Sequence, residues 1–323
     1  MSHILVSGLI NIETTLQVEG FPIPYFPVRY PFHGVNSTVS GVGYNLAKAL
    51  LTLGDEIAFL SIIGEDIAAQ QVRAALETDQ IPEENVRSLM PRTAQSVIIY
   101  DPQGRRQIHT DLKDIQETVY PQEIFEREMA RCDLLALCNI NFSRPFLSKA
   151  QQAGKIIATD VHTISQLYDD YNRDFMRAAD ILFMSDENLP SNPEDWAKQM
   201  QHAYGTEILV IGLGARGALL AVRSDNFIER FPAVTVRPVV NTIGAGDALF
   251  SAFLHSYLES GDPYNAIQKA IVFASYKIGE KGAAEGFLSH TELEEITKTS
   301  EVYENLGGLA ELHRWENKTA PHE

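Results

Sequence analysis

Residues 241–250 read Asn-Thr-Ile-Gly-Ala-Gly-Asp-Ala-Leu-Phe, so that small residues and one acid stand directly before an apolar segment of helical period. Glycines let a backbone approach a ligand closely, and the amides of a helix's first turn attract an anion. The spacing alone supports two interpretations equally. Asp247 is either a favourable acidic residue at a helix N-terminus, or a base that takes a hydroxyl proton while the neighbouring amides stabilise a transferring phosphoryl group.

On both sides of this stretch, short apolar runs alternate with segments of helical period, which is typical of a parallel sheet covered by helices on both faces. The predicted strands are 4–6, 57–63, 134–137, 156–159, 181–184 and 208–211. The predicted helices include 40–53, 67–76, 121–131, 144–152, 245–258 and 263–279. Residues 218–223, 227–231 and 234–236 are expected as antiparallel strands at one edge, and a polar segment from Thr297 as a surface helix with a frayed tail.

Two regions interrupt this alternation. Residues 14–39 hold four prolines among β-forming residues, and 96–110 are typical of a hairpin that turns at Asp101-Pro-Gln-Gly. Both suit a small β-sheet beside the main body. Spacing alone leaves two interpretations even: a flap that covers a substrate and excludes water, or an ordinary surface excursion.

Composition narrows the classes of partner. The chain has 323 residues, 45% of them apolar, and a formal net charge of −17, which disfavours a nucleic-acid partner. No apolar run approaches the roughly 18 residues of a membrane span, and the N-terminus lacks a basic signal region, so no membrane association is expected. Two cysteines, Cys132 and Cys138, are too few for a disulfide framework and indicate structural thiols in a cytoplasmic protein.

Two further glycine clusters are weak signals by themselves. Residues 40–45 read Ser-Gly-Val-Gly-Tyr-Asn at the start of a helix, where Asn45 suits sugar hydroxyls or Ser40 merely caps the helix. Residues 211–217 read Ile-Gly-Leu-Gly-Ala-Arg-Gly after a strand, which suits a nucleotide phosphate or a tight turn. The sequence lacks a Walker motif, a zinc-ligand spacing and a dinucleotide fingerprint, so those classes are disfavoured.

Together these stretches resemble the ribokinase-like (PfkB) carbohydrate kinase family over roughly residues 3–290. The Gly-Ala-Gly-Asp at 244–247 matches the family's C-terminal signature Asp-Thr-x-Gly-Ala-Gly-Asp, and residues 40–45 resemble its N-terminal Gly-Gly-x-x-x-Asn. Weaker likenesses lie at residues 8–13, 64–66 and 214–217. The resemblance implies a three-layer α/β/α core with a mostly parallel central sheet and a small β-sheet lid. The core would be 1–13, 40–95 and 111–323, and the lid 14–39 and 96–110. This favours the flap interpretation, and family members often dimerise through that lid.

The resemblance also assigns roles to residues. Asp247 would be the general base, and the amides of Gly244, Ala245 and Gly246 the anion hole. The substrate would contact Glu13, Gly41 and Asn45, and Asn139 is added because it ends a core strand at the ligand-binding edge. The nucleotide would lie against Gly212, Gly214, Gly217 and Thr242. ATP and magnesium (Mg²⁺) are the implied cofactors, with Asp186 and Glu187 as metal ligands and a monovalent cation as a further candidate.

Several positions depart from the family pattern. The first acid of the C-terminal signature, which supports the monovalent cation and the anion hole, is Asn241 here. The family's Asn-x-x-Glu reads Ser-Asp-Glu-Asn at 185–188, and a threonine near the ATP phosphates is Gly212. The first glycine of the N-terminal pair is Ser40, and the substrate aspartate is the longer Glu13. These changes together suggest an atypical substrate, weak activity, or both.

The expected function is transfer of the γ-phosphoryl group of ATP to a hydroxyl of a sugar or sugar-like small molecule. Two alternatives are a nucleoside kinase of the same family and a catalytically weak relative that acts as a ligand-binding or regulatory protein. Arg105 and Arg106 in the hairpin are interpreted as solvated turn charges in preference to contacts with an acidic substrate.

Overall fold

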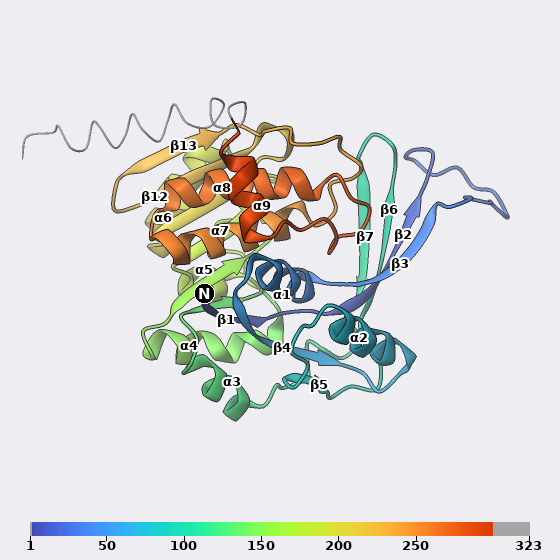
Figure 1. The fold of residues 1–323 in the computed structure, drawn as a ribbon, viewed down its shortest axis with the longest axis horizontal. Helices are drawn as coiled ribbons and strands as arrows, with labels where there is room; N and C mark the ends of the chain where they lie inside the picture. The colour runs from blue at the N-terminus through green and yellow to red at the C-terminus, as the bar shows by residue number, and fades with distance from the viewer. Residues whose placement is uncertain (1, 300–323) are drawn as a thin grey trace, which may run out of the picture.

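The computed structural model describes residues 2–299, and its centre is a nine-stranded sheet in the order β13-β12-β11-β10-β9-β8-β1-β4-β5 (Figure 1). The strands are β1 (His3–Ser7), β4 (Glu56–Ile63), β5 (Val86–Ser88), β8 (Leu134–Leu137), β9 (Ile156–Asp160), β10 (Ile181–Ser185), β11 (Ile208–Gly212), β12 (Ala218–Val222) and β13 (Phe227–Phe231). Neighbours from β5 to β11 are parallel, and β12 and β13 extend the edge antiparallel. The carboxyl ends of the parallel strands therefore share one edge of the sheet.

Helices cover both faces of this sheet. The helices are α1 (Val42–Leu53), α2 (Ile67–Thr78), α3 (Gln122–Met129), α4 (Arg144–Gln152), α5 (Arg173–Ala178), α6 (Pro193–Tyr204), α7 (Ala245–Ser260), α8 (Pro263–Lys277) and α9 (His290–Thr297). Successive side chains of a strand point to opposite faces, so Ile4 and Val6 join the core under α1, α7 and α8, while Leu5 joins the core under α4 and α6. The predicted three-layer α/β/α arrangement is confirmed.

A second, smaller sheet projects from the core on the right of Figure 1, in the order β3-β2-β6-β7. Its strands are β2 (Asn11–Gln17), β3 (Val35–Ser40), β6 (Gln95–Tyr100) and β7 (Arg106–Asp111). The central pair β2–β6 is parallel, and the two outer pairs are antiparallel. The proline-rich stretch and the predicted hairpin thus meet in one lid, although they are far apart in the sequence.

One predicted strand is wrong. Residues 234–236 form no strand, because they bind α8 through a single side chain and do not extend the sheet edge. The Ser275 hydroxyl donates to the Val234 carbonyl at 2.6 Å and accepts from the Val236 amide at 3.2 Å. The surface helix expected from Thr297 falls largely outside the described residues. Within residues 2–299, no helix has both the length and the apolar character that crossing a membrane requires.

Candidate active site

A continuous chain of polar side chains joins the lid, α1 and α7. Asn45 on α1 donates from Nδ2 to Asp247 Oδ2 at 2.6 Å. Ser40 Oγ, at the end of β3, lies 3.3 Å from Asn45 Oδ1 and 3.2 Å from Glu13 Oε2 on β2, and its hydroxyl can donate to either oxygen. Four residues spread over 235 positions of the sequence are thereby brought into one site, and three of them were predicted to act there.

The start of α1 sets the positions of Ser40 and Asn45. Gly41 is the N-cap residue with φ 107°, a conformation that favours glycine, and a Cβ there would lie 2.6 Å from the Leu9 carbonyl oxygen. The alternative in which Ser40 caps the helix is not observed, because α1 has no side-chain cap. The Ser40 hydroxyl is instead directed to Glu13 and Asn45, so this departure from the family pattern is part of the site.

The start of α7 has the geometry of an anion-binding turn. Gly244 is the N-cap residue with φ 76°, and a Cβ on it would meet the Ala283 carbonyl oxygen at 2.4 Å. No side chain caps the helix, which leaves first-turn amides for a ligand. The Ala245 amide already donates to the Thr242 carbonyl at 3.3 Å, a long bond that a stronger acceptor can displace.

The surroundings of Asp247 raise its pKa to about 6, chiefly because the carboxylate loses hydration. The nearby charge of Asp160 acts in the same direction. The hydrogen bond from Asn45 and the charges of His162 and Lys277 lower the pKa and offset part of this effect. A carboxyl group with a pKa near 6 is largely ionised at neutral pH and is a stronger base than an ordinary aspartate.

Two acceptor atoms on β2 are buried without a hydrogen-bond partner in the described structure: Glu13 Oε1 and Asn11 Oδ1. Burial raises the pKa of Glu13, and the Asp247 charge adds to that shift. Leaving such acceptors unpaired costs free energy, and each of them could accept a bond from a separate donor group of a ligand. Sequence reasoning missed Asn11. The signal was available, because Asn11, Glu13 and Thr15 alternate along β2 and place polar side chains on its buried face.

Lys277 is a second residue that sequence reasoning missed. It is the last residue of α8, is fully buried, and donates from Nζ to the carbonyl of Ile243, the residue before Gly244. Burial lowers its pKa to about 8, while the charges of Asp247 and Glu13 act in the opposite direction. A lysine in an otherwise amphipathic helix gave no sequence signal of burial.

The lid is docked onto the turn that precedes α7. Ile98 of β6 packs with Ile243 and Ala283 in a small apolar cluster. Arg106 of β7 donates from Nη1 to the Thr242 hydroxyl at 3.1 Å and lies 3.4 Å from the Thr242 carbonyl oxygen. The interpretation of Arg106 as a solvated turn charge is therefore corrected, because its guanidinium joins the lid to the core. Arg105 instead pairs with Asp101 inside its own hairpin.

The third glycine cluster lies at the end of β11. Gly212 ends the strand, a short 3-10 turn covers Gly214–Arg216, and Gly217 closes the loop through its carbonyl, which accepts from the Leu213 amide at 2.8 Å. The Gly212 carbonyl accepts from the Asp186 amide at 3.0 Å, so this loop and the predicted metal ligands are adjacent. The Asp186 carboxylate is paired with Arg216, and Glu187 is exposed.

Asn139 follows β8 at the same edge of the sheet. Its Nδ2 donates to Asn172 Oδ1 at 2.9 Å, and its carbonyl accepts from the Tyr171 hydroxyl at 3.0 Å. These bonds fix the loop before α5. No hydrogen bond among the described residues joins Asn139 to the Asp247 chain, and its role in binding a substrate stays a prediction.

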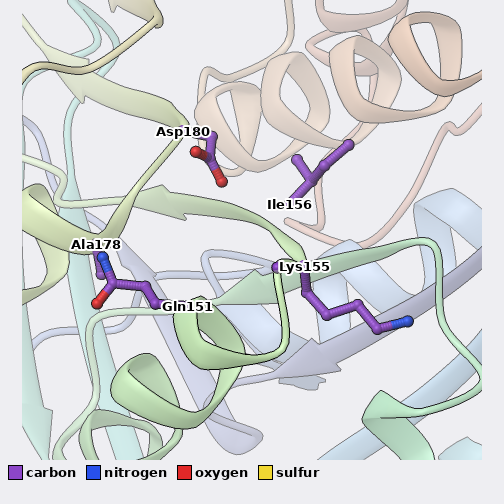
Figure 2. A pocket seen from close by; sticks show the side chains of 6 residues that line it. Gln151, Lys155, Ile156, Ala178 and Asp180 are labelled. Carbon is purple, nitrogen blue, oxygen red and sulfur yellow. The ribbon is translucent and has the colours of Figure 1, made fainter.

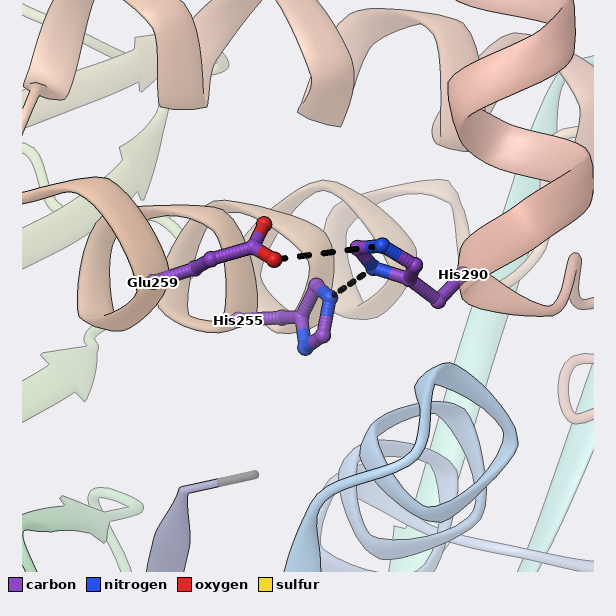
Figure 3. Close-up of side chains that lie close together, drawn as sticks. All are labelled: His255, Glu259 and His290. Atoms are coloured by element: carbon purple, nitrogen blue, oxygen red, sulfur yellow. Dashed lines mark hydrogen bonds and ion pairs between the residues drawn. The ribbon is translucent and has the colours of Figure 1, made fainter.

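Two other groupings lie away from this site. A pocket of about 360 Å³ is lined by Gln151, Lys155 and Asp180, beside the first residues of β9 and β10 (Figure 2). Farther along α7, His255 Nε2 lies 3.0 Å from His290 Nδ1, and His290 Nε2 lies 3.8 Å from Glu259 (Figure 3). These donor types bind zinc in other proteins, but here His255 and His290 bond to each other and Glu259 also lies 3.7 Å from Lys269.

The chain is similar in sequence and in fold to known proteins. Residues 1–290 match the family described as pfkB family carbohydrate kinase. The chain is 26% identical over 289 residues to an ATP-dependent ribose-1-phosphate kinase of Halopiger xanaduensis, which covers 88% of this chain and 94% of that relative. It is also 26% identical over 270 residues to an acarbose 7(IV)-phosphotransferase of an Actinoplanes species, covering 81% of this chain and 87% of that relative.

A solved structure of a microbiome-derived acarbose kinase has the same fold, with a TM-score of 0.81 and 24% identity over 91% of this chain and 98% of that one. The family match covers residues 1–290 of the 323. The chain therefore belongs to the pfkB family of carbohydrate kinases and is a phosphotransferase with an alcohol group as acceptor.

Proposed function

We propose that the protein transfers the γ-phosphoryl group of ATP to a hydroxyl of a sugar or a sugar-like molecule, with Asp247 as the general base. The observation that carries the proposal is the pairing of Asp247 and Asn45 at 2.6 Å, in the first turn of a helix whose N-terminus has no side-chain cap. A carboxylate repels the phosphate that such a turn attracts, so its presence there needs a reason. Accepting the proton of the reacting hydroxyl supplies that reason. Its raised pKa suits the transfer of that proton.

The mechanism follows from where each group lies. Asp247 accepts the proton of the attacking hydroxyl, while amides of residues 244–246 stabilise charge on the transferring phosphoryl group. Glu13 Oε1 and Asn11 Oδ1, both buried without a partner, accept bonds from other hydroxyls of the substrate and orient it. The lid contacts at Ile243 and Thr242 hold the lid against the turn.

The nucleotide would lie along the β11 loop at Gly212, Gly214 and Gly217, with Thr242 beside its phosphates. Carboxylate oxygens are the ligands that Mg²⁺ prefers. The donor chemistry of Asp186 and Glu187 therefore fits that ion, provided that Asp186 exchanges its bond to Arg216. When bound, Mg²⁺ would neutralise charge on the phosphate oxygens.

The proposal also includes location and assembly. Cys132 and Cys138 are buried free thiols, as expected in a reducing cytoplasm. The lid carries large apolar side chains at the surface, among them Tyr25, Tyr30 and Phe32. Pairing of two lids in a homodimer would cover them.

A second candidate is a family relative that binds ligands but transfers phosphate poorly. The departures at Asn241, Ser185 and Asn188 favour it. The raised pKa of Asp247 argues against it, because a binding protein gains nothing from a destabilised carboxylate beside an anion-binding turn.

The test is ADP release from Mg-ATP over a panel of sugars, sugar phosphates, amino-sugar oligosaccharides and nucleosides, with Asp247→Asn measured beside the wild type. We expect a substrate-dependent signal that the variant loses while it retains ATP binding. ATP binding without turnover on any member of the panel would favour the ligand-binding candidate. Turnover by Asp247→Asn at the wild-type rate would remove Asp247 as the base.

A further inference from the structure

Residues at and just after the end of α8 hold in place the turn that carries the proposed anion hole. The Ile278 carbonyl accepts from the amides of Val240 at 2.8 Å and Asn241 at 3.2 Å. Asn241 Nδ2 donates to the Lys281 carbonyl at 2.5 Å, and its Oδ1 accepts from the Ile243 amide at 2.9 Å. Residues 240–243 therefore lie on residues 277–281, and only one of the bonds between them comes from a charged side chain.

That charged side chain is Lys277, whose ammonium group binds the Ile243 carbonyl with no exposure to solvent. A buried ammonium is costly unless carbonyl oxygens and opposite charges surround it. Lys277 has the Ile243 carbonyl as a direct partner, and the charges of Asp247 and Glu13 raise its pKa against the effect of burial. Glu285 acts in the same direction, and Arg237 opposes it.

Two backbone carbonyl oxygens, at this turn and just after the end of α8, already accept bonds from side chains. Backbone carbonyls are the ligands that proteins offer to dehydrated monovalent cations. Around this turn, the Ile243 carbonyl is occupied by the ammonium of Lys277, and the Lys281 carbonyl by the amide of Asn241. An amide at position 241 supplies a donor where an acid would supply a negative charge for a cation. The two differences from a cation-binding arrangement agree with each other: Asn241 lacks the negative charge that would attract a cation, and Lys277 supplies a positive charge of its own.

Resting on the proposed function, we propose that Lys277 is a positioning residue whose ammonium group takes the place of a free monovalent cation beneath the anion hole. The ammonium group binds the Ile243 carbonyl and thereby holds the turn at 244–246. It also supplies one positive charge near the carboxylates of Asp247 and Glu13. The enzyme then needs no added potassium.

The proposal is tested with turnover in chloride salts of potassium, ammonium and the inert cation choline. We expect the wild-type rate to agree within about twofold in all three salts. Lys277→Met should lose about a hundredfold in choline, the scale of one lost stabilising group in such a site. It should recover at least tenfold, in a saturable manner, in potassium or ammonium, because either ion can enter the space that the ammonium vacates.

Lys269→Met is the matched control. Lys269 is on the same helix and pairs with Glu259 and Glu294, away from the turn, so its loss should create no dependence on the salt. A wild type that potassium activates severalfold would overturn the proposal. A folded Lys277→Met that no monovalent cation restores would overturn it equally.

Thermal unfolding supplies a readout that does not depend on a substrate. Potassium should raise the melting temperature of Lys277→Met relative to choline and should leave the wild type and Lys269→Met unchanged. If the wild type phosphorylates nothing but this pattern appears, the proposed function fails and the role of Lys277 stands. If Lys277→Met does not fold in choline, Lys277→Gln is measured in the same way, and equal melting in all salts contradicts the proposal.

Discussion

Helix α7 is joined by polar bonds to α1 at its first turn and to the residue that follows the C-cap of α1 farther along, and the two junctions differ in character. At the first turn of α7, Asn45 binds Asp247 in a group that contains two carboxylates and a buried ammonium. Eight residues farther along α7, about 12 Å by the rise of a helix, Asp55 Oδ2 lies 2.8 Å from His255 Nδ1. His290 completes the chain, with its Nδ1 3.0 Å from His255 Nε2 (Figure 3).

The junction at Asp247 contains a buried acceptor without a hydrogen-bond partner among the described residues, whereas Asp55, His255 and His290 are bonded to one another. Glu13 Oε1 has no partner in the described structure, and the pKa values of Asp247 and Glu13 are both raised. Asp55, in contrast, is bound to His255 on the buried side of α7, and His255 is bound to His290. Unpaired buried groups reduce stability, and a bound ligand is one way in which such groups are satisfied. We therefore expect the junction at Asn45 and Asp247 to serve function and the junction at His255 to serve stability.

The largest expected effect is the loss of turnover when Asp247, in the first junction, is replaced. Asp247→Asn should lower kcat about a thousandfold, since the amide cannot accept the proton. The same variant should unfold at a higher temperature at pH 7–8. The raised pKa of about 6 means that ionised Asp247 opposes folding there, by about 1–2 kcal/mol after allowance for its partial exposure. Kinetics and thermal unfolding measure both changes.

His255→Ala is the counterpart at the other junction. It leaves the buried Asp55 carboxylate without its partner and should cost about 2–3 kcal/mol of unfolding free energy. Its turnover at 25 °C should stay within about twofold of the wild type. A thousandfold loss of turnover in this variant would mean that the two junctions are not functionally distinct.

The second prediction concerns the pH dependence of kcat/KM. Asp247 must be ionised to accept a proton, so kcat/KM should fall about tenfold per pH unit below its pKa of about 6. Asn45→Ala removes the hydrogen bond that lowers this pKa. The acid limb of the variant should then move to higher pH, because lost hydration and the charge of Asp160 still raise the pKa of Asp247, while the charges of His162 and Lys277 oppose them without help from Asn45. An unmoved limb would assign the titration to another group.

The third prediction tests the unpaired atom of Glu13. Glu13→Gln keeps the shape of the side chain and removes its charge, which weakens a bond from a substrate hydroxyl by about 1.5 kcal/mol or more. KM for the acceptor should rise about tenfold, with a smaller change in kcat and no change in KM for ATP. Steady-state kinetics with each substrate varied in turn measure the split. A change confined to the KM of ATP would place Glu13 on the nucleotide side.

The elements that were predicted correctly and incorrectly show which features can be predicted from the sequence. Strand β8 (Leu134–Leu137) and helix α4 (Arg144–Gln152) were predicted to the residue, since apolar runs and helical period are local signals. The strand at 234–236 was wrong because its bonds are made by Ser275, which is about 40 residues away. Gly244 to Asp247 could be singled out from composition and order alone.

What the sequence could not supply are contacts between distant residues. The Asn45–Asp247 bond spans 202 positions, and Lys277 reaches Ile243 across 34. A lysine near the end of a helix is ordinarily solvated, so only packing distinguishes Lys277 from the others. Asn11 was missed for a different reason. Its alternation with Glu13 and Thr15 is visible in the sequence, but which face of β2 is buried follows from how the lid meets the core.

The smallest expected effect belongs to His290, at the outer end of the paired junction. Its side chain is 39% exposed and its ring binds His255 at 3.0 Å, so water can replace much of what His290→Ala removes. The cost should be about 0.5–1 kcal/mol, or a fall of a few degrees in melting temperature, with turnover unchanged. Combined with His255→Ala, the loss should be less than the sum of the two single losses, because one bond is removed in both. Strict additivity would show that His290 contributes nothing through His255, and the junction would then consist of the Asp55–His255 bond alone.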